Sequence, residues 1–153
     1  MISVKLGYRK KGRVVCQTMK FSQRVAASLN ITGMAFVNML VTDQNGVYNC
    51  QMYDVMFEPV CRNTWHIHAG GQILLCTDGV GYYQEKGKAA RRLVRGDVGE
   101  IPPEVEHWHG AAPDCSFTHI GISPNTDKGA ATWLSPVTDE EYMQTTGGND
   151  VSV

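Results

Sequence analysis

From residue 33 onward, glycine, proline, asparagine and aspartate divide the sequence into short apolar runs. Runs of about four to eight residues that are bounded by such turn residues and rich in β-branched and aromatic side chains are typical of β-strands. Many short strands at roughly even spacing favour an all-β sandwich or barrel. We therefore predict strands over residues 34–41, 51–58, 63–68, 72–77, 81–85, 89–94, 98–101 and 116–123.

A single domain is predicted over residues 33–145, and the segments on either side differ from it. Residues 1–32 form a basic N-terminal arm, because seven lysine and arginine residues and no acidic residue precede Asp43. The aromatic and basic modules that bind RNA are not apparent, so we expect the arm to lie on the acidic remainder of the chain, as in a homodimer, and to bind no nucleic acid. We also predict a short helix over residues 20–30 and a flexible tail over residues 146–153.

The end of the domain carries a helix signal. Thr138 and Glu141 have the spacing of a capping box, and Val137 stands where a hydrophobic staple residue would stand. This pattern predicts a short C-terminal helix over residues 139–144.

Length and composition exclude several classes of protein. The 153 residues suffice for one compact domain with a core but not for two. The five cysteines are odd in number and show no C-x-x-C spacing, so neither a disulfide framework nor a cysteine zinc site is expected. No apolar run approaches the roughly 18 residues of a membrane span, and the N-terminus lacks the apolar stretch of a secretory signal. We therefore expect a cytoplasmic protein that does not bind membranes.

The histidines fall in three neighbouring β segments. They are His66, His68, His107, His109 and His119. The first four form two His-x-His pairs, and residues two apart on a strand point to the same face of the sheet. Two glycines follow the first pair and can turn the chain, so that Gln72 begins the next strand beside it. Since convergent imidazoles are common metal ligands, this set predicts a site for one divalent metal ion.

Two stretches of the chain resemble the two motifs of the cupin superfamily. Residues 60–81, VCRNTWHIHAGGQILLCTDGVG, contain His-x-His, an acidic or amide ligand position four residues later, and a glycine. Residues 96–110, GDVGEIPPEVEHWHG, show the spacing of the second motif from Gly96 through Pro102 to His107, although Glu104 replaces a glycine. The resemblance covers about residues 33–145. It implies a single-domain cupin jelly-roll β-barrel with the short helix at its C-terminus.

The resemblance also implies a ligand set. Its members are His66, His68, Gln72 and His107. Most cupins have a glutamate where this chain has Gln72. Three imidazoles and an amide leave the 2+ charge of an ion uncompensated, which makes the ion a stronger Lewis acid. Such nitrogen and oxygen ligands suit manganese, iron, cobalt, nickel or zinc.

A narrower likeness connects the chain to the small cupins associated with carboxymuconolactone decarboxylases. It rests on WHxH at 65–68, GQ at 71–72, HWHGAAP at 107–113 and VTDExY at 137–142. That group includes manganese-dependent hydroxynitrile lyases, so the likeness implies manganese and a lyase that acts on a small carbonyl or hydroxyl compound. Those enzymes use a histidine at the position of His119, and they have a glutamine where this chain has Ser123.

Two histidines outside the ligand set are candidate catalytic residues. His119 is the candidate general base or acid, because a neutral imidazole can transfer a proton near pH 7. His109 could assist His119 or orient a ligand, and the alternative for each is a buried, hydrogen-bonded structural role. The fold alone does not choose between the lyase and three alternatives: an oxygen-dependent dioxygenase, an isomerase of sugars or keto acids, and a non-catalytic small-molecule-binding module.

Overall fold

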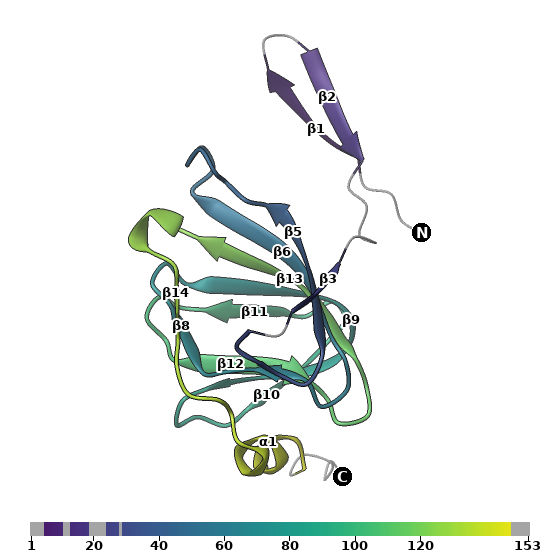
Figure 1. Cartoon of the computed structure of the whole chain (residues 1–153), viewed down its shortest axis with the longest axis vertical. Helices are drawn as coiled ribbons and strands as arrows, with labels where there is room; N and C mark the ends of the chain where they lie inside the picture. Colours follow the sequence, from purple (N-terminus) through teal and green to yellow (C-terminus); the bar gives the residue numbers. More distant parts are fainter. Residues whose placement is uncertain (1–4, 11–12, 19–23, 28, 148–153) are drawn as a thin grey trace.

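The computed structural model describes residues 5–10, 13–18, 24–27 and 29–147, and its main body is a nearly closed β-barrel (Figure 1). The barrel strands follow the order β14 (Ala131–Trp133), β8 (His66–His68), β12 (His107–Ala111), β9 (Gln72–Glu85), β13 (Phe117–Pro124), β6 (Cys50–Phe57), β5 (Ala35–Val41) and β3 (Val25–Ala27). Off this path, β10 (Arg91–Val94) and β11 (Val98–Ile101) pair with β9, and β4 (Ile31–Thr32) pairs with β7 (Arg62–Asn63). The prediction of an all-β barrel is confirmed.

The long strand β9 joins the two sides of the barrel. Its first half pairs with β11 and β13, and its second half pairs with β10 and β12. The sequence predicted two strands here, at residues 72–77 and 81–85, and this prediction is wrong because one strand continues through Asp78 and Gly79. Gly79 adopts φ +73°, and a Cβ atom there would overlap the carbonyl oxygen of Ser116 on the neighbouring chain segment. The glycine therefore permits a close approach beside the register shift between Thr118 and His119 instead of ending the strand.

Side chains that alternate along the strands build two cores. The inner core fills one part of the barrel with residues such as Phe57, Leu74 and Phe117. The outer cluster contains Trp65 and Trp108, which are 3% and 0% exposed, together with Tyr82, Ala112, Val137 and Tyr142. Both tryptophans pack in this outer cluster, and alternation along β12 gives Trp108 the face opposite to His107 and His109.

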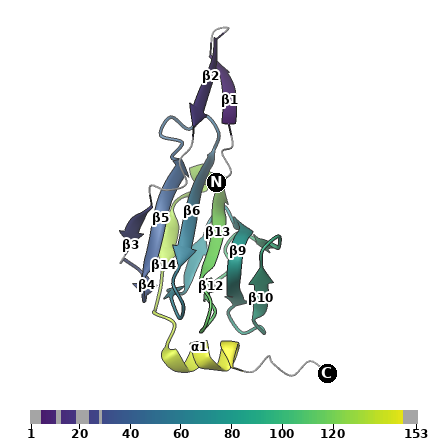
Figure 2. The ribbon, with the colours of Figure 1, turned by 90° about the vertical axis from the view of Figure 1, so that its right-hand side faces the viewer.

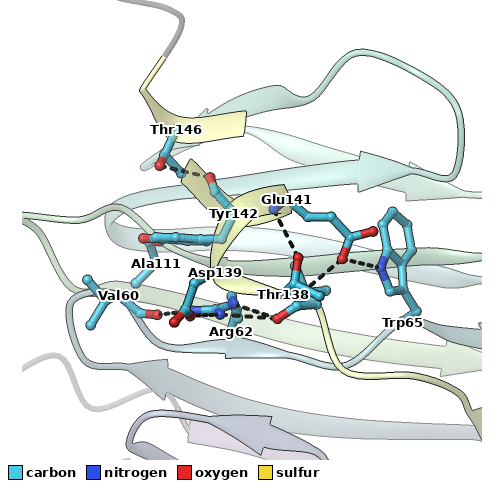
Figure 3. A network of polar contacts seen from close by, with 10 residues as sticks. Val60, Arg62, Trp65, Ala111, Thr138, Asp139, Glu141, Tyr142 and Thr146 are labelled. Atoms are coloured by element: carbon cyan, nitrogen blue, oxygen red, sulfur yellow. Dashed lines mark hydrogen bonds and ion pairs between the residues drawn. The ribbon is translucent and has the colours of Figure 1, made fainter. Parts of the chain in front are cut away.

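The single helix of the described residues, α1 (Asp139–Thr146), lies at one end of the barrel (Figure 2). The predicted capping box is present, since the Thr138 hydroxyl accepts from the Glu141 backbone N–H and the Glu141 carboxylate accepts from the Thr138 backbone N–H. Val137 and Tyr142 are buried in one cluster, which confirms the staple. Figure 3 shows how Arg62 joins the helix to the barrel by donating to the Val137 carbonyl and by pairing with Asp139. No helix of the described residues is long and apolar enough to cross a membrane.

The N-terminal residues differ from the sequence-based expectation. The helix predicted over residues 20–30 is wrong where the structure describes it, because Val25–Ala27 is strand β3 and pairs with β5. Residues 19–23 and 28 lie outside the described residues. Just before β3, Arg24 forms a two-pronged ion pair with the buried Asp54 carboxylate at 2.7 and 3.0 Å. This contact attaches the start of β3 to β6.

The remaining elements are a two-stranded hairpin and a short 3-10 turn. β1 (Lys5–Lys10) and β2 (Arg13–Thr18) form a separate antiparallel hairpin, which Figures 1 and 2 show at the end of the molecule opposite α1. A short 3-10 turn, η1 (Thr126–Lys128), precedes β14. Most of the tail predicted over residues 146–153 lies outside the described residues, since they end at residue 147.

Candidate metal centre

The histidine-bearing strands meet on the inside of the barrel. His107 of β12 is the register partner of His66 of β8, so the two imidazoles lie side by side with ring centroids 4.1 Å apart. Gly71 adopts φ +84° and donates its backbone N–H to the His68 carbonyl, which closes the turn between β8 and β9. Gln72 consequently begins β9 beside the histidines, as the sequence predicted. Glu104, at the position where cupins have a glycine, keeps a left-handed conformation with φ +63°.

Three of the imidazoles could hold a metal ion together. His66, His107 and His109 are buried, and each offers one nitrogen such that the three nitrogens lie within 4.8 Å of one another. The predicted ligand His68 is not one of these three, although its ring centroid lies 5.2 Å from His66 and 5.9 Å from His107, no farther than that of His109. The amide oxygen Oε1 of Gln72 lies 3.0 Å from Nε2 of His107. The structure therefore brings all four predicted ligands together and adds His109 to the same cluster.

Hydrogen bonds decide which atoms of the cluster carry protons. Nδ1 of His66 donates to the Thr64 carbonyl at 2.8 Å, and Nδ1 of His107 donates to the Val105 carbonyl at 2.8 Å. A neutral imidazole carries one proton, so Nε2 of each ring has a free lone pair. The side-chain amide of Gln72 donates its N–H to a tyrosine hydroxyl at 2.7 Å, which turns its oxygen toward His107. Nε2 of His107 and Oε1 of Gln72 are thus both hydrogen-bond acceptors, and they lie 3.0 Å apart with no proton between them. A cation bound by both atoms would satisfy their lone pairs.

The hydrogen bonds of His109 leave its ring without a free lone pair. The Asn63 side-chain amide donates to Nε2 of His109 at 3.0 Å, and its oxygen accepts from the His109 backbone N–H at 2.9 Å. Since an amide N–H can only donate, Nε2 is the unprotonated nitrogen and Nδ1 carries the proton. Among the described residues this Nδ1 has no hydrogen-bond partner. His109 therefore presents a free N–H donor rather than a free lone pair.

His119 is fully buried. It is 0% exposed, and within the described part of the chain neither of its ring nitrogens has a hydrogen-bond partner. Its ring stacks on Phe117 at 5.0 Å, contacts Phe57 at 5.6 Å and stands perpendicular to His109 at 4.9 Å between centroids. An unpartnered buried imidazole is costly, which points to a role other than packing.

Burial lowers the pKa of every histidine in the cluster. The pKa falls from the usual 6.5 to about 4 at His68 and His107 and to about 3 at His119, with desolvation as the largest cause. The pKa of His66 and His109 falls well below 6.5 for the same reason, and neighbouring imidazoles add to the effect. All five rings are therefore neutral at pH 7, as cation binding requires.

Two residues of the site were missed by sequence reasoning. Tyr53 of β6 places its hydroxyl 2.7 Å from Nε2 of Gln72 and 2.9 Å from the hydroxyl oxygen of Ser123, and Ser123 in turn lies 3.4 Å from Nδ1 of His68. Asn63 precedes the first His-x-His pair and fixes the tautomer of His109. Both are polar residues on predicted strands, but their partners depend on strand register, which the sequence does not show.

A cavity of about 310 Å³ opens beside the cluster. Its wall is mainly apolar, with side chains that include Ile31, Val37, Met39, Val55 and Trp133. Its polar lining residues are Gln51, Tyr53, Asn63, His66, His68, Gln72, His109, Ser123 and Thr126. His119 does not line this cavity. The site thus combines a hydrocarbon-binding wall with a small polar cluster, as small-molecule sites usually do.

The chain resembles known proteins over most of this region. Residues 61–144 match the AraC-like ligand binding domain family. The chain is 44% identical over 90 residues to the (R)-mandelonitrile lyase of Granulicella tundricola, which covers 59% of this chain and 69% of that enzyme. The crystal structure of a cupin-like protein from Thermotoga maritima MSB8 is 55% identical, with a TM-score of 0.82 over 86% of this chain and 100% of that one. A predicted oxalate decarboxylase of Thermotoga maritima is 15% identical, with a TM-score of 0.57 over 73% of this chain and 91% of that one, and so shares the fold alone.

Proposed function

The chain belongs to the AraC-like ligand binding domain family and to the cupin superfamily, and we propose that it is a metal-dependent lyase acting on a small cyanohydrin or related hydroxyl compound. The observation that carries the proposal is the convergence of lone pairs, with Nε2 of His107 and Oε1 of Gln72 facing each other at 3.0 Å while their protons are engaged elsewhere. We assign the ligand roles to His66, His68, Gln72 and His107. The likeness to manganese-dependent lyases favours manganese.

The ligand assignment follows the hydrogen bonds and leaves His109 out. His109 belongs to the cluster by distance, but its Nε2 lone pair accepts from Asn63 and its Nδ1 is protonated. His68 fits better, because when its Nδ1–H donates to the Ser123 hydroxyl oxygen at 3.4 Å, its Nε2 keeps a free lone pair. When bound, a divalent ion in this ligand set supplies a Lewis acid that stabilises negative charge on a substrate oxygen.

The remaining histidines have different tasks in this proposal. His109 lines the cavity with its ring, while its Nδ1–H is buried and has no hydrogen-bond partner among the described residues. His119 packs against the His109 ring and neither of its ring nitrogens has a partner among the described residues, so its free lone pair is the candidate proton acceptor in this proposal. In cyanohydrin cleavage the hydroxyl loses its proton, the C–C bond breaks with its electron pair leaving on cyanide, and cyanide takes up a proton. The apolar wall binds the hydrocarbon part of the substrate.

A second candidate function is small-molecule binding without turnover. The name of the matching family and the absence of His119 from the cavity lining favour it. In this case the same cavity and polar cluster would bind a ligand, and the protein would release it unchanged.

Metal content and cyanide release test the proposal. The protein is purified without a chelator or a metal-affinity tag and compared with His107→Ala and with Glu104→Ala, a control on the exposed loop before β12. We expect about one equivalent of a transition metal in the parent and the control and none in His107→Ala. Protein loaded with Mn²⁺ should release cyanide from mandelonitrile, and His107→Ala should not.

Other outcomes point elsewhere. A parent that retains no metal even after addition of Mn²⁺, Fe²⁺, Ni²⁺ or Zn²⁺ would overturn the metal centre. A metal-loaded parent that binds mandelonitrile or benzaldehyde without turnover would support the binding function. Oxygen consumption by the iron-loaded protein would replace the lyase by an oxygen-dependent enzyme.

A further inference from the structure

The side chains of Tyr53 and Ser123 are hydrogen-bonded to each other and contact two candidate ligands from the cavity side. The Tyr53 hydroxyl lies 2.7 Å from Nε2 of Gln72 and 2.9 Å from the Ser123 hydroxyl, which lies 3.4 Å from Nδ1 of His68. These two side chains thus contact two of the four assigned ligands, and in both cases they contact a nitrogen that is not the assigned ligand atom. Partners of this kind orient ligands and tune metal sites in other proteins.

The position of the tyrosine ring is determined by the neighbouring strand. Tyr53 of β6 is the register partner of Gly121 of β13. A Cβ atom at position 121 would overlap Cε2 of the Tyr53 ring, so the ring crosses the strand where only a glycine leaves room. The hydroxyl is therefore held beside Gln72 by packing as well as by its hydrogen bonds.

Orientation matters for Gln72 in a way that it does not for a glutamate. The two ends of a side-chain amide have nearly the same shape, but only the oxygen has lone pairs for a cation. A rotation of the amide by half a turn would direct N–H donors at His107 and at an ion. A carboxylate presents oxygen in either orientation. A cupin with glutamine at this position thus needs a group that selects one orientation.

We propose that Tyr53 is the positioning residue that holds the Gln72 amide with its oxygen toward the metal centre. The Tyr53 oxygen accepts from the amide N–H, and this interaction favours the orientation in which Oε1 lies 3.0 Å from Nε2 of His107. The inference rests on the metal ligation proposed above, and it explains how an amide serves where most cupins have a carboxylate. The Ser123 hydroxyl supports the tyrosine and connects it to His68.

A double-mutant cycle tests this role through metal affinity. Metal-free protein is titrated with Mn²⁺, and free Mn²⁺ is followed by electron paramagnetic resonance for the parent, Tyr53→Phe, Gln72→Glu and the double variant. We expect Tyr53→Phe to lower the affinity about tenfold or more, as loss of such a partner usually does. In the Gln72→Glu background the same substitution should change the affinity by less than about threefold, because either carboxylate oxygen can ligate. Tyr48→Phe, at an exposed tyrosine outside the site, serves as the matched control.

The possible results separate this inference from the proposed function. A parent that binds one Mn²⁺ together with a Tyr53→Phe variant of unchanged affinity would overturn the positioning role and leave the metal centre intact. An equal loss of affinity in both backgrounds would also overturn it, because a merely structural defect does not depend on residue 72. A parent that binds no Mn²⁺ would overturn the metal centre itself and the inference with it.

Discussion

The contact between Asn63 and His109 gives a prediction whose size follows from the structure. Both side chains are buried, with 4% and 3% of their surface exposed. In Asn63→Ala the His109 backbone N–H and Nε2 each lose their partner at 2.9 and 3.0 Å. Each buried polar group left without a hydrogen bond costs about 1–3 kcal/mol, so for two groups we expect the free energy of unfolding to fall by roughly 2–6 kcal/mol. Urea denaturation measures this, with Asn45→Ala on an exposed loop as the control.

The charged variant Asn63→Asp tests the tautomer rather than the stability. A carboxylate at residue 63 still accepts from the His109 backbone N–H, but it cannot donate to Nε2, so the proton should move to Nε2 and leave a lone pair on Nδ1. Nitrogen-15 chemical shifts of labelled histidine distinguish the two tautomers. If Asn63→Ala lost less than about 0.5 kcal/mol, or if Asn63→Asp kept the parental tautomer, the assignment of His109 as an N–H donor would be refuted.

Two further predictions concern the helix and the pH dependence. Arg62→Met removes donors to the Val137 and Val60 carbonyls and should lower the free energy of unfolding by about 2–4 kcal/mol. Hydrogen exchange in α1 should also become faster, and exchange rates equal to those of the parent would contradict the anchoring role. The metal-free protein should lose stability as the pH falls from about 6.5 toward 4, because His107 and His119, with native pKa values of about 4 and about 3, bind fewer protons when folded than when unfolded. Each can contribute up to about 1.4 kcal/mol per pH unit, and urea midpoints that stay constant from pH 7 to pH 5 would contradict this.

Strand periodicity predicted most of the barrel because it depends on local pattern alone. The predicted strand at 98–101 agrees with β11, and the capping box correctly predicted α1. The predicted strand at 63–68 is divided between β7 and β8, and the two predicted strands at 72–77 and 81–85 are one. The error in β9 arises because a glycine within a strand and a glycine in a turn look the same in a sequence. Only the neighbouring strand shows which is present.

The site was predicted less completely because its chemistry depends on pairs far apart in the chain. Alternation along a strand predicted that His66 and His68, and His107 and His109, share faces. It could not show that Asn63 would contact His109, 46 residues away, or that Tyr53 would contact Gln72, 19 residues away. The distinction between a histidine that ligates and one that donates a proton is a matter of hydrogen bonds to such partners. The sequence spacing thus identifies the candidate histidines, but the strand register determines their hydrogen-bond partners and therefore which ring nitrogen carries the proton.

The register between β6 and β13 explains how Ser123 takes part in the site. The hydroxynitrile lyases that the chain resembles have a glutamine there, and a longer amide on β13 would reach into the volume beside Gln72 and His68. In this chain the Tyr53 hydroxyl occupies that position, 2.9 Å from the short Ser123 side chain, and its ring needs the space above Gly121. The site thus depends on three residues together: Gly121 leaves room for the Tyr53 ring, and Ser123 contacts the Tyr53 hydroxyl. In this arrangement the polar group beside Gln72 comes from β6. Tyr53 and Ser123 consequently form the part of the cavity wall beside Gln72 and His68.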